Sequence, residues 1–336
     1  MKNHIANASP IDAVITWVDG NDPNHRRKRH EMLANDGGYS EIPIAAGRDD
    51  TRFADNGELR YCLASIRKFA PWVRHIFLVT DNQVPHFLTP ELTREYRVKI
   101  IDHREIFTAY EWALPTFNSR TIETAIWRID ELADRFIYFN DDFLLVKAIN
   151  PDEFFPDGSI LLRGEWQASK HYGKLRVSLN LLLNLLIKHL LGRTRTMNLA
   201  AQMRSAKLAG FSKKYFQSPH TPRPVRKNTL ADYFSRHPQI FEENIKYKFR
   251  DMSQFLAISL ADHLEIIRGE ALLAGCDEAA IIRGEQDSAA SIRGTLEQVE
   301  RGEYNFLCLG SLEKLGGELR AEVYRQIDGI LGLQTS

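Results

Sequence analysis

Short apolar runs alternate with helical patterns along the first half of the chain. The runs DAVITWV (12–18), HIFLVT (75–80) and VKIID (98–102) are rich in β-branched and aromatic residues, and they predict three buried strands. Between the first two runs, GELRYCLASIRKFA places its large apolar residues at helical spacing, with Asp55 or Asn56 as the N-cap. The pattern therefore predicts an α/β fold.

The alternation continues with SRTIETAIWRIDELAD (119–134), a predicted amphipathic helix, and with the strand RFIYFN that follows it. Strands that alternate with helices favour a Rossmann-like, mostly parallel sheet flanked by helices. In such sheets, ligands bind beyond the carboxyl ends of the strands. Asp19, Asp81 and Asp142 each come just after a predicted strand, so we expect three carboxylates to meet at one crevice.

The second half of the chain begins with a region, 164–217, that predicts a mainly helical insertion. Its most apolar run, residues 177–191, is too short and too polar to cross a bilayer, so we expect a core helix there. The proline-rich, basic connector SPHTPRPVRK (218–227) favours extended backbone. NFLCLG (305–310) predicts a last strand, and an amphipathic helix is expected to close the chain.

Composition narrows the class of protein. With 336 residues, of which 43% are hydrophobic, the chain can form one large domain or two ordinary ones. The 44 Lys and Arg residues balance the 44 Asp and Glu residues, so no overall field favours nucleic acid or a membrane surface. Cys62, Cys276 and Cys308 have no CxxC spacing, which argues against a disulfide framework and a structural zinc site.

Location is expected to be cytoplasmic. The odd number of cysteines favours a reducing compartment. MKNHIANASPIDAV has no apolar stretch behind Lys2, so we do not expect a secretory signal. The basic run NHRRKRH would suit a peripheral contact with the inner membrane face, although a solvated helix face is its ordinary explanation.

The triplet Asn140-Asp141-Asp142 is the first candidate for chemistry. It follows the apolar run FIYF, and apolar residues resume at once with Phe143. Adjacent carboxylates at a strand end can hold a hard divalent cation beside a diphosphate. A solvated turn is the commoner use of such a pair, but charges flanked by buried chain on both sides need a partner.

Three further polar residues have ordinary explanations when each is taken alone. Glu123, beside the apolar stripe of its helix, would be an exposed helical glutamate. His220 lies in the basic connector and could act as a general base beside a phosphate clamp, although a loop histidine is usually only exposed. Arg250 and Asp251 would by default form a surface pair of small energy.

Together, the segments that carry these residues resemble the Stealth family of sugar-1-phosphate transferases, which includes bacterial capsular polysaccharide phosphotransferases. The segments similar to its signature regions are IDAVITWVDGNDP, RFADNGELRYCLASIRKFAPWVRHIFLVTDNQVP, LPTFNSRTIETAIWRI, FIYFNDDFLL, SPHTPRP and KYKFRDMSQF. The resemblance runs from about residue 11 to residue 310 and is closest in the first half. It implies transfer of hexose-1-phosphate from a UDP-sugar to a hydroxyl of an acceptor glycan, with release of UMP.

The resemblance also implies roles for individual residues. Asp141 and Asp142 would hold Mg²⁺ or Mn²⁺. Glu123 and Asp142 would either position this cation or orient the base and the sugar hydroxyls, and which of them has which role stays open. His220 is the candidate base, and Arg250, with Arg223 or Arg60, would contact phosphate oxygens. The implied catalytic residues are Glu123, Asp142, His220 and Arg250, and the implied donor-binding residues are Asp19, Asn56, Arg60, Asp81 and Arg223.

The expected partners are a UDP-sugar donor and a glycan or lipid-linked glycan acceptor, with no nucleic acid. A homodimer stays open. The alternatives are a metal-dependent glycosyltransferase, which would release UDP, and a non-catalytic glycan-binding protein. The expected regions are a Rossmann-like nucleotide-sugar-binding region (11–163), the helical insertion (164–217), a His/Arg region that completes the α/β core (218–310) and a C-terminal helix (311–336).

Overall fold

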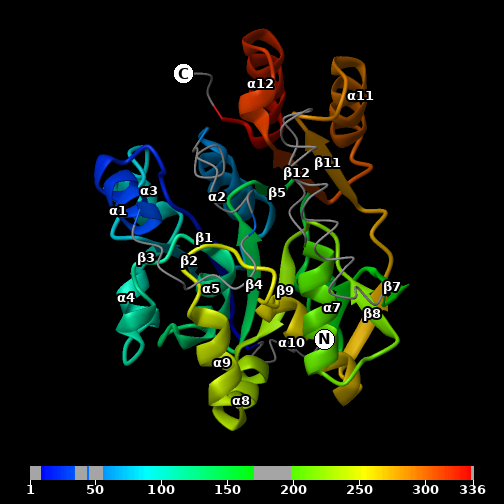
Figure 1. Ribbon diagram of the computed structural model, residues 1–336. Helices are drawn as coiled ribbons and strands as arrows, with labels where there is room; N and C mark the ends of the chain where they lie inside the picture. The colour runs from blue at the N-terminus through cyan, green and yellow to red at the C-terminus, as the bar shows by residue number, and fades with distance from the viewer. Residues whose placement is uncertain (1–8, 35–43, 45–55, 170–197, 334–336) are drawn as a thin grey trace.

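A five-stranded sheet forms the centre of the protein in a computed structural model, which describes residues 9–34, 44, 56–169 and 198–333 (Figure 1). Its strand order is β3-β2-β1-β4-β9. The first four strands in this order are parallel, and β9 joins β4 as an antiparallel edge. The mostly parallel, Rossmann-like sheet is thus confirmed. The strands are β1 (Ile11–Thr16), β2 (Ile76–Thr80), β3 (Val98–Asp102), β4 (Arg135–Asn140) and β9 (Arg223–Arg226).

Both faces of the sheet are covered, as expected for parallel strands with mostly apolar residues. Ala13 and Ile15 of β1 pack with α2 (Glu58–Phe69) on one face. On the other face, Val14 packs with α5 (Ser119–Ala125) and α10 (Ala257–Arg268). Tyr138 of β4 belongs to this second face. The period of two along each strand therefore decides which side chains can reach α5.

Two predicted helix details are wrong. Helix α2 is N-capped by Gly57, at φ 88°, and not by Asn56, while Asp55 lies outside the described residues. Glycine reaches this left-handed conformation without strain. The amide Nδ2 of Asn56 instead donates to Glu58 Oε1 at 3.1 Å.

The second wrong detail is the length of the helix predicted over 119–134. Helix α5 ends at Ala125, a 3₁₀ turn follows at Ile126–Arg128, and Ile129 already has extended backbone. Ile126, Ile129 and Leu132 remain buried, so the apolar spacing reports contact with the core and not the length of the helix.

The remaining strands form smaller sheets. In the sheet β11-β12-β5, β12 confirms the strand predicted at 305–310. It pairs antiparallel with β5, the strand that directly follows the NDD triplet. The strands are β5 (Phe143–Leu145), β6 (Ile160–Arg163), β7 (Glu165–Ala168), β8 (Lys214–Gln217), β10 (Ala271–Ala274), β11 (Ala279–Arg283) and β12 (Phe306–Gly310). Strand β6 pairs with β10 and β7 pairs with β8.

The other helices lie around these sheets, with α11 and α12 at one end of the molecule and α8 and α9 at the other (Figure 1). Within the described ranges, no helix is long and apolar enough to cross a membrane. The helices are α1 (Pro23–Ala34), α3 (Pro90–Glu95), α4 (His103–Ile106), α7 (Asn198–Leu208), α8 (Lys227–Arg236), α9 (Pro238–Ile245), α11 (Ala289–Glu300) and α12 (Gly317–Leu331).

The predicted region boundaries stay predictions. Of the insertion expected at 164–217, the structure describes strands β7 and β8 near its two ends and helix α7 between them. The apolar run at 177–191 lies outside the described residues, as does the loop at 36–51 apart from Ile44.

Candidate active site

A buried asparagine fixes the start of α5. Asn118 is 1% exposed and caps the helix, because its Oδ1 accepts from Arg120 N at 3.1 Å. Its Nδ2 donates to the carbonyl oxygens of Tyr247 (3.1 Å) and Phe249 (2.9 Å) and to Gln254 Oε1 (2.9 Å). These bonds attach the segment KYKFRDMSQF to α5 across more than a hundred residues of sequence.

This attachment places Arg250 beside Glu123. The guanidinium Nη2 of Arg250 donates to Ser119 Oγ at 2.5 Å, and Ser119, one turn before Glu123 on the helix, helps to lower the pKa of the Glu123 carboxyl. Ser119 therefore lies between two of the predicted catalytic residues. Glu123 is not the freely exposed helical glutamate of the ordinary explanation.

The surroundings of Glu123 combine burial with positive charge. Burial raises the pKa of its carboxyl, and the nearby guanidinium groups of Arg120 and Arg223 oppose that rise. Hydrogen bonds with Ser119 and Tyr138 also favour the ionised form. A carboxylate withdrawn from water and surrounded by donors is what a positioned catalytic group requires.

Arg223 extends from β9 toward Glu123, and two other side chains hold its guanidinium. Its Nη2 donates to Ser218 Oγ at 3.0 Å and forms an ion pair with Asp262. Burial lowers the pKa of Arg223 to about 10, and the charge of Glu123 is the largest opposing influence. Arg223 is the register partner of Tyr138 across the β4–β9 pair.

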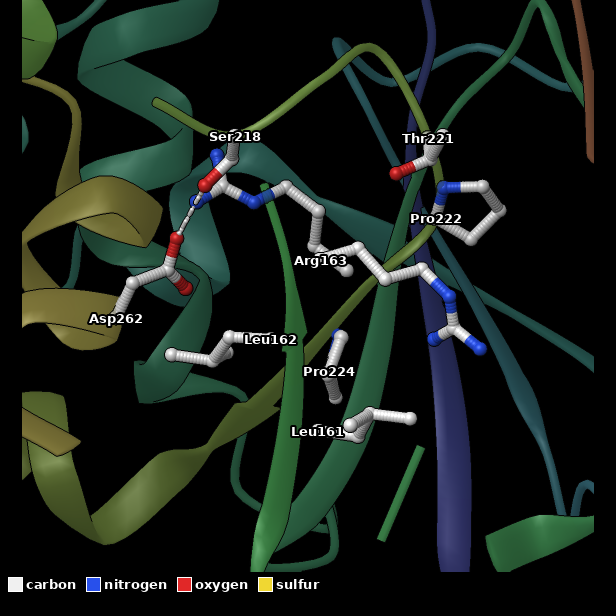
Figure 2. A pocket seen from close by; sticks show the side chains of 9 residues that line it. Leu161, Leu162, Arg163, Ser218, Thr221, Pro222, Pro224 and Asp262 are labelled. Carbon is white, nitrogen blue, oxygen red and sulfur yellow. Dashed lines mark hydrogen bonds and ion pairs between the residues drawn. The ribbon is translucent and has the colours of Figure 1, made fainter. Parts of the chain in front are cut away.

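A small cavity lies behind Arg223. Figure 2 shows Ser218 and Asp262 pointing toward each other at its wall, with Pro222 and Pro224 farther along the connector. Its volume of about 10 Å³ suits a single water molecule, not a nucleotide sugar. The cavity thus belongs to the support of Arg223.

The NDD triplet is held by the last strand of the fold. Leu309 N donates to the carbonyl oxygen of Asp142 at 2.9 Å, and Cys308 Sγ donates to Asp142 Oδ2 at 3.6 Å. Burial and the charge of Asp142 raise the pKa of the Cys308 thiol, so it stays protonated and can donate. Strand β12 therefore fixes both the main chain and the carboxylate of Asp142.

His220 lies on the connector between β8 and β9, exposed to solvent. Its ring meets Phe143 edge-on, with 5.8 Å between the ring centroids. Phe143 directly follows Asp142, so this contact places the imidazole beside the NDD turn. The structure thus places His220 against the residue that follows Asp142, and Arg250 against Ser119, one turn before Glu123.

The predicted donor-binding residues lie at the same carboxyl edge but have other partners. The main chain of Asp19 makes two hydrogen bonds with the side chain of Gln83. Asp19 N donates to Gln83 Oε1 at 2.9 Å, and Gln83 Nε2 donates to the carbonyl oxygen of Asp19 at 3.0 Å. Asp81 accepts from Lys28 Nζ at 3.0 and 3.2 Å. Gln83 thus joins the ends of β1 and β2, and Lys28 neutralises Asp81.

Asn56 and Arg60 lie toward α12. The carbonyl oxygen of Asn56 accepts from Tyr324 Oη at 2.9 Å. The guanidinium of Arg60 lies 5.9 Å from the ring centroid of Tyr61, which stacks on Tyr324.

The donor set at the NDD turn fits a hard cation that takes part of its shell from elsewhere. Among the described residues, no group of three His, Cys, Asp or Glu side chains is placed to hold an ion. Asp141 and Asp142 supply two adjacent carboxylates. Mg²⁺ is commonly bound by one or two carboxylates together with substrate phosphates and water.

Several solved structures align over most of the chain at low similarity. A galactosyltransferase LgtC in complex with donor and acceptor sugar analogs is 9% identical, with a TM-score of 0.42 over 97% of this chain and 96% of that chain.

Sequence relatives are much closer. Residues 9–37 match Stealth protein conserved region 1, and residues 52–161 match conserved region 2. Capsular polysaccharide phosphotransferase fcs1 of Haemophilus influenzae is 33% identical over 275 residues, which are 79% of this chain and 67% of that protein.

Two further relatives match a shorter stretch. Capsular polysaccharide phosphotransferase cps12A of Actinobacillus pleuropneumoniae is 40% identical over 47% of this chain and 41% of its own length. Exopolysaccharide phosphotransferase SCO6023 of Streptomyces coelicolor is 46% identical over 44% of this chain and 23% of its own length. The match thus spans less than half of these two proteins. Both conserved regions and the long match to the Haemophilus protein show that the chain belongs to the Stealth family.

Proposed function

We propose that this protein is a sugar-1-phosphate transferase of capsular or exopolysaccharide synthesis. It would move hexose-1-phosphate from a UDP-sugar to a hydroxyl of a glycan acceptor. The names of the relatives support the reaction class. The observation that carries the proposal is the chain of contacts from Arg250 through Ser119 to Glu123, which lies beside Tyr138 and the NDD turn.

In this reaction, the acceptor oxygen forms a bond to the phosphorus that bears the sugar. The bond from that phosphorus to the bridging oxygen breaks, and UMP leaves. The acceptor proton passes to His220, whose exposed position at the NDD turn suits a base that meets an incoming glycan. Such a base typically contributes about 10² to 10⁴ in rate.

The arginines would balance the charge of the diphosphate. The planar guanidinium of Arg250 can contact two phosphate oxygens at once. Its bond to Ser119 fixes its direction before the donor arrives, so little reorganisation is needed in the transition state. Arg223 is partly buried, with its side chain 15% exposed, and we propose that it acts mainly by stabilising ionised Glu123.

Asp141 and Asp142 would hold Mg²⁺ or Mn²⁺, which when bound supplies positive charge to the diphosphate. In a titration of each metal chloride against activity, Asp142→Asn should raise the half-saturating concentration about tenfold, since a ligand charge is lost. The matched control is Asp152→Asn at an exposed position. An unaltered metal response would remove Asp142 from the cation's ligands.

The reaction class is tested by the nucleotide product. Purified protein is incubated with a panel of UDP-sugars and short glycan primers, and the nucleotides are separated by anion exchange. We expect UMP together with a phosphodiester-linked product. Release of UDP would identify a glycosyltransferase instead. Glycan binding without any nucleotide release would identify a non-catalytic protein.

A further inference from the structure

The hydroxyl of Tyr138 lies between three segments of the candidate site. Its Oη is 3.0 Å from Thr16 Oγ1, at the end of β1, and 3.0 Å from Asn140 Oδ1, the first residue of the NDD triplet. It also lies near the carboxyl of Glu123 on α5, whose pKa it helps to lower. The Tyr138 side chain is 4% exposed, so its ring belongs to the core and only its hydroxyl serves these partners.

Hydrogen-bond accounting gives this hydroxyl a specific task. A phenol has one proton to donate. Thr16 can donate to Tyr138 Oη, because its hydroxyl is both donor and acceptor. The one proton of Tyr138 then has two acceptors, Asn140 Oδ1 and the Glu123 carboxylate. The hydroxyl therefore connects the glutamate on α5 to the turn that carries the two aspartates.

The charges around Tyr138 keep that proton in place. Burial and the negative charges of Glu123, Asp141 and Asp142 raise the pKa of Tyr138 well above its ordinary value. Its register partner Arg223 directs a positive charge at Glu123 from the neighbouring strand. Tyr138 is thus a permanent donor placed among acceptors.

We propose that Tyr138 is a positioning residue for the transfer reaction. Its hydroxyl sets the Glu123 carboxylate and the NDD turn in one fixed arrangement, so that Glu123 and Asp142 act on the same diphosphate. This inference rests on the proposed function. A phenylalanine at position 138 would satisfy the apolar pattern of the strand FIYF equally well, and positions 136 and 139 of this strand are phenylalanine. The hydroxyl is the feature that packing does not require.

The test is Tyr138→Phe, which keeps the ring and removes the hydroxyl, with its hydrogen bonds to Thr16 and Asn140 and its influence on Glu123. We expect kcat for UMP release to fall about 10²-fold, since a small misplacement of reacting groups costs that much. The KM for the donor should change by less than about threefold, because the hydroxyl contacts protein groups and not the nucleotide. Tyr233→Phe, on α8, is the matched control and should be active as wild type. A fall of less than fivefold, or a rise in KM alone, would overturn the proposal.

A double-mutant cycle separates positioning from simple destabilisation. If Tyr138 acts through Glu123, adding Tyr138→Phe to Glu123→Gln should lower kcat by less than about threefold further. Losses that multiply independently would overturn the proposal. Should Tyr138→Phe not fold, Thr16→Val removes one bond from the same hydroxyl, and unchanged kcat in that variant would count against the inference.

The two failures can be told apart. Wild-type protein that releases no UMP from any donor of the panel would end the proposed function, and the inference with it. Wild-type protein that releases UMP at the same rate as Tyr138→Phe would end the inference alone.

Discussion

Two neighbouring parts of the carboxyl edge of the sheet are built in different ways. We call them the Glu123 group (Glu123, Tyr138, Arg223 and Arg250) and the strand-end pairs (Asp19 with Gln83, and Lys28 with Asp81). Members of the Glu123 group come from segments more than a hundred residues apart and lie close together in a partly buried place. In the strand-end pairs, Asp81 has Lys28 as its partner, while Gln83 bonds to the main chain of Asp19 and the Asp19 carboxylate accepts from Asn21 N.

The difference predicts where each region acts in the reaction. Desolvated charges fixed by several bonds need no rearrangement, so they are suited to stabilising a transition state and should affect kcat. Charges already neutralised by a partly exposed neighbour contribute little to the transition state, and they should affect the KM of the donor. Each prediction below tests one side of this contrast.

The largest expected effect is on the base. His220→Ala should lower kcat by about 10² to 10⁴, because it removes the proton acceptor, while the donor KM stays within about threefold. Steady-state UMP release measures both quantities. His86→Ala, at an exposed position after β2, is the control. Turnover that persists within fivefold would mean that another group accepts the proton.

The next effect is on the support of Arg250. Asn118→Ala leaves the carbonyl groups of Tyr247 and Phe249 and the amide of Gln254 without their buried donor. We expect the free energy of unfolding to fall by about 2 to 4 kcal/mol, and kcat to fall as well. Urea unfolding and UMP release are the measurements. Asn150→Ala, a helix-flanking asparagine without a capping bond, should change neither. A stable but inactive variant would show that Asn118 has a direct role in the chemistry.

The sequence predicts the sheet well, because each of its four parallel strands has an apolar run in its middle. Parallel strands that are covered on both faces need such runs. Helix ends were less predictable. Gly57 caps α2 through its backbone conformation, so the sequence contains no capping side chain that would indicate the helix start. Ile129 is buried after the end of α5, and its position continues the helical spacing although the helix has ended.

The candidate site was predictable only in part, since the resemblance supplied Glu123, Asp142, His220 and Arg250 but none of their supports. Asn118, Tyr138 and Cys308 bond to residues far away in sequence, and single-residue patterns do not encode such contacts. One local signal existed for Tyr138. A tyrosine in a fully buried strand must find a partner for its hydroxyl, and a polar group at the next strand end is the nearest choice.

Acid stability tests the interior behind the Glu123 group. The pKa of His263 is lowered to about 4 by burial and the charge of Arg223, with the Ser259 carbonyl opposing them. Below pH 6.5 the unfolded chain binds a proton that the folded protein does not, so the free energy of unfolding falls as the pH falls toward 4. At pH 5 this imidazole should cost about 2 kcal/mol relative to pH 7.

Urea unfolding at pH 7 and pH 5 measures this cost. His263→Gln keeps an acceptor for Phe216 N–H and cannot be protonated, so it should lose about 2 kcal/mol less than wild type between the two values. His86→Gln is the exposed control. Equal losses in wild type and His263→Gln would place the acid sensitivity elsewhere.

The smallest effect is expected from the strand-end pairs. In Asp81→Asn, Lys28 loses a partly exposed ion pair, with side chains 34% and 18% exposed, which is worth about 1 kcal/mol or less. That corresponds to a rise in donor KM of at most about fivefold, with kcat unchanged. Lys28→Met added to Asp81→Asn should restore part of the binding, because it removes the charge left unpaired. If kcat instead fell more than tenfold, Asp81 would act in the transition state and the two regions would not differ in kind.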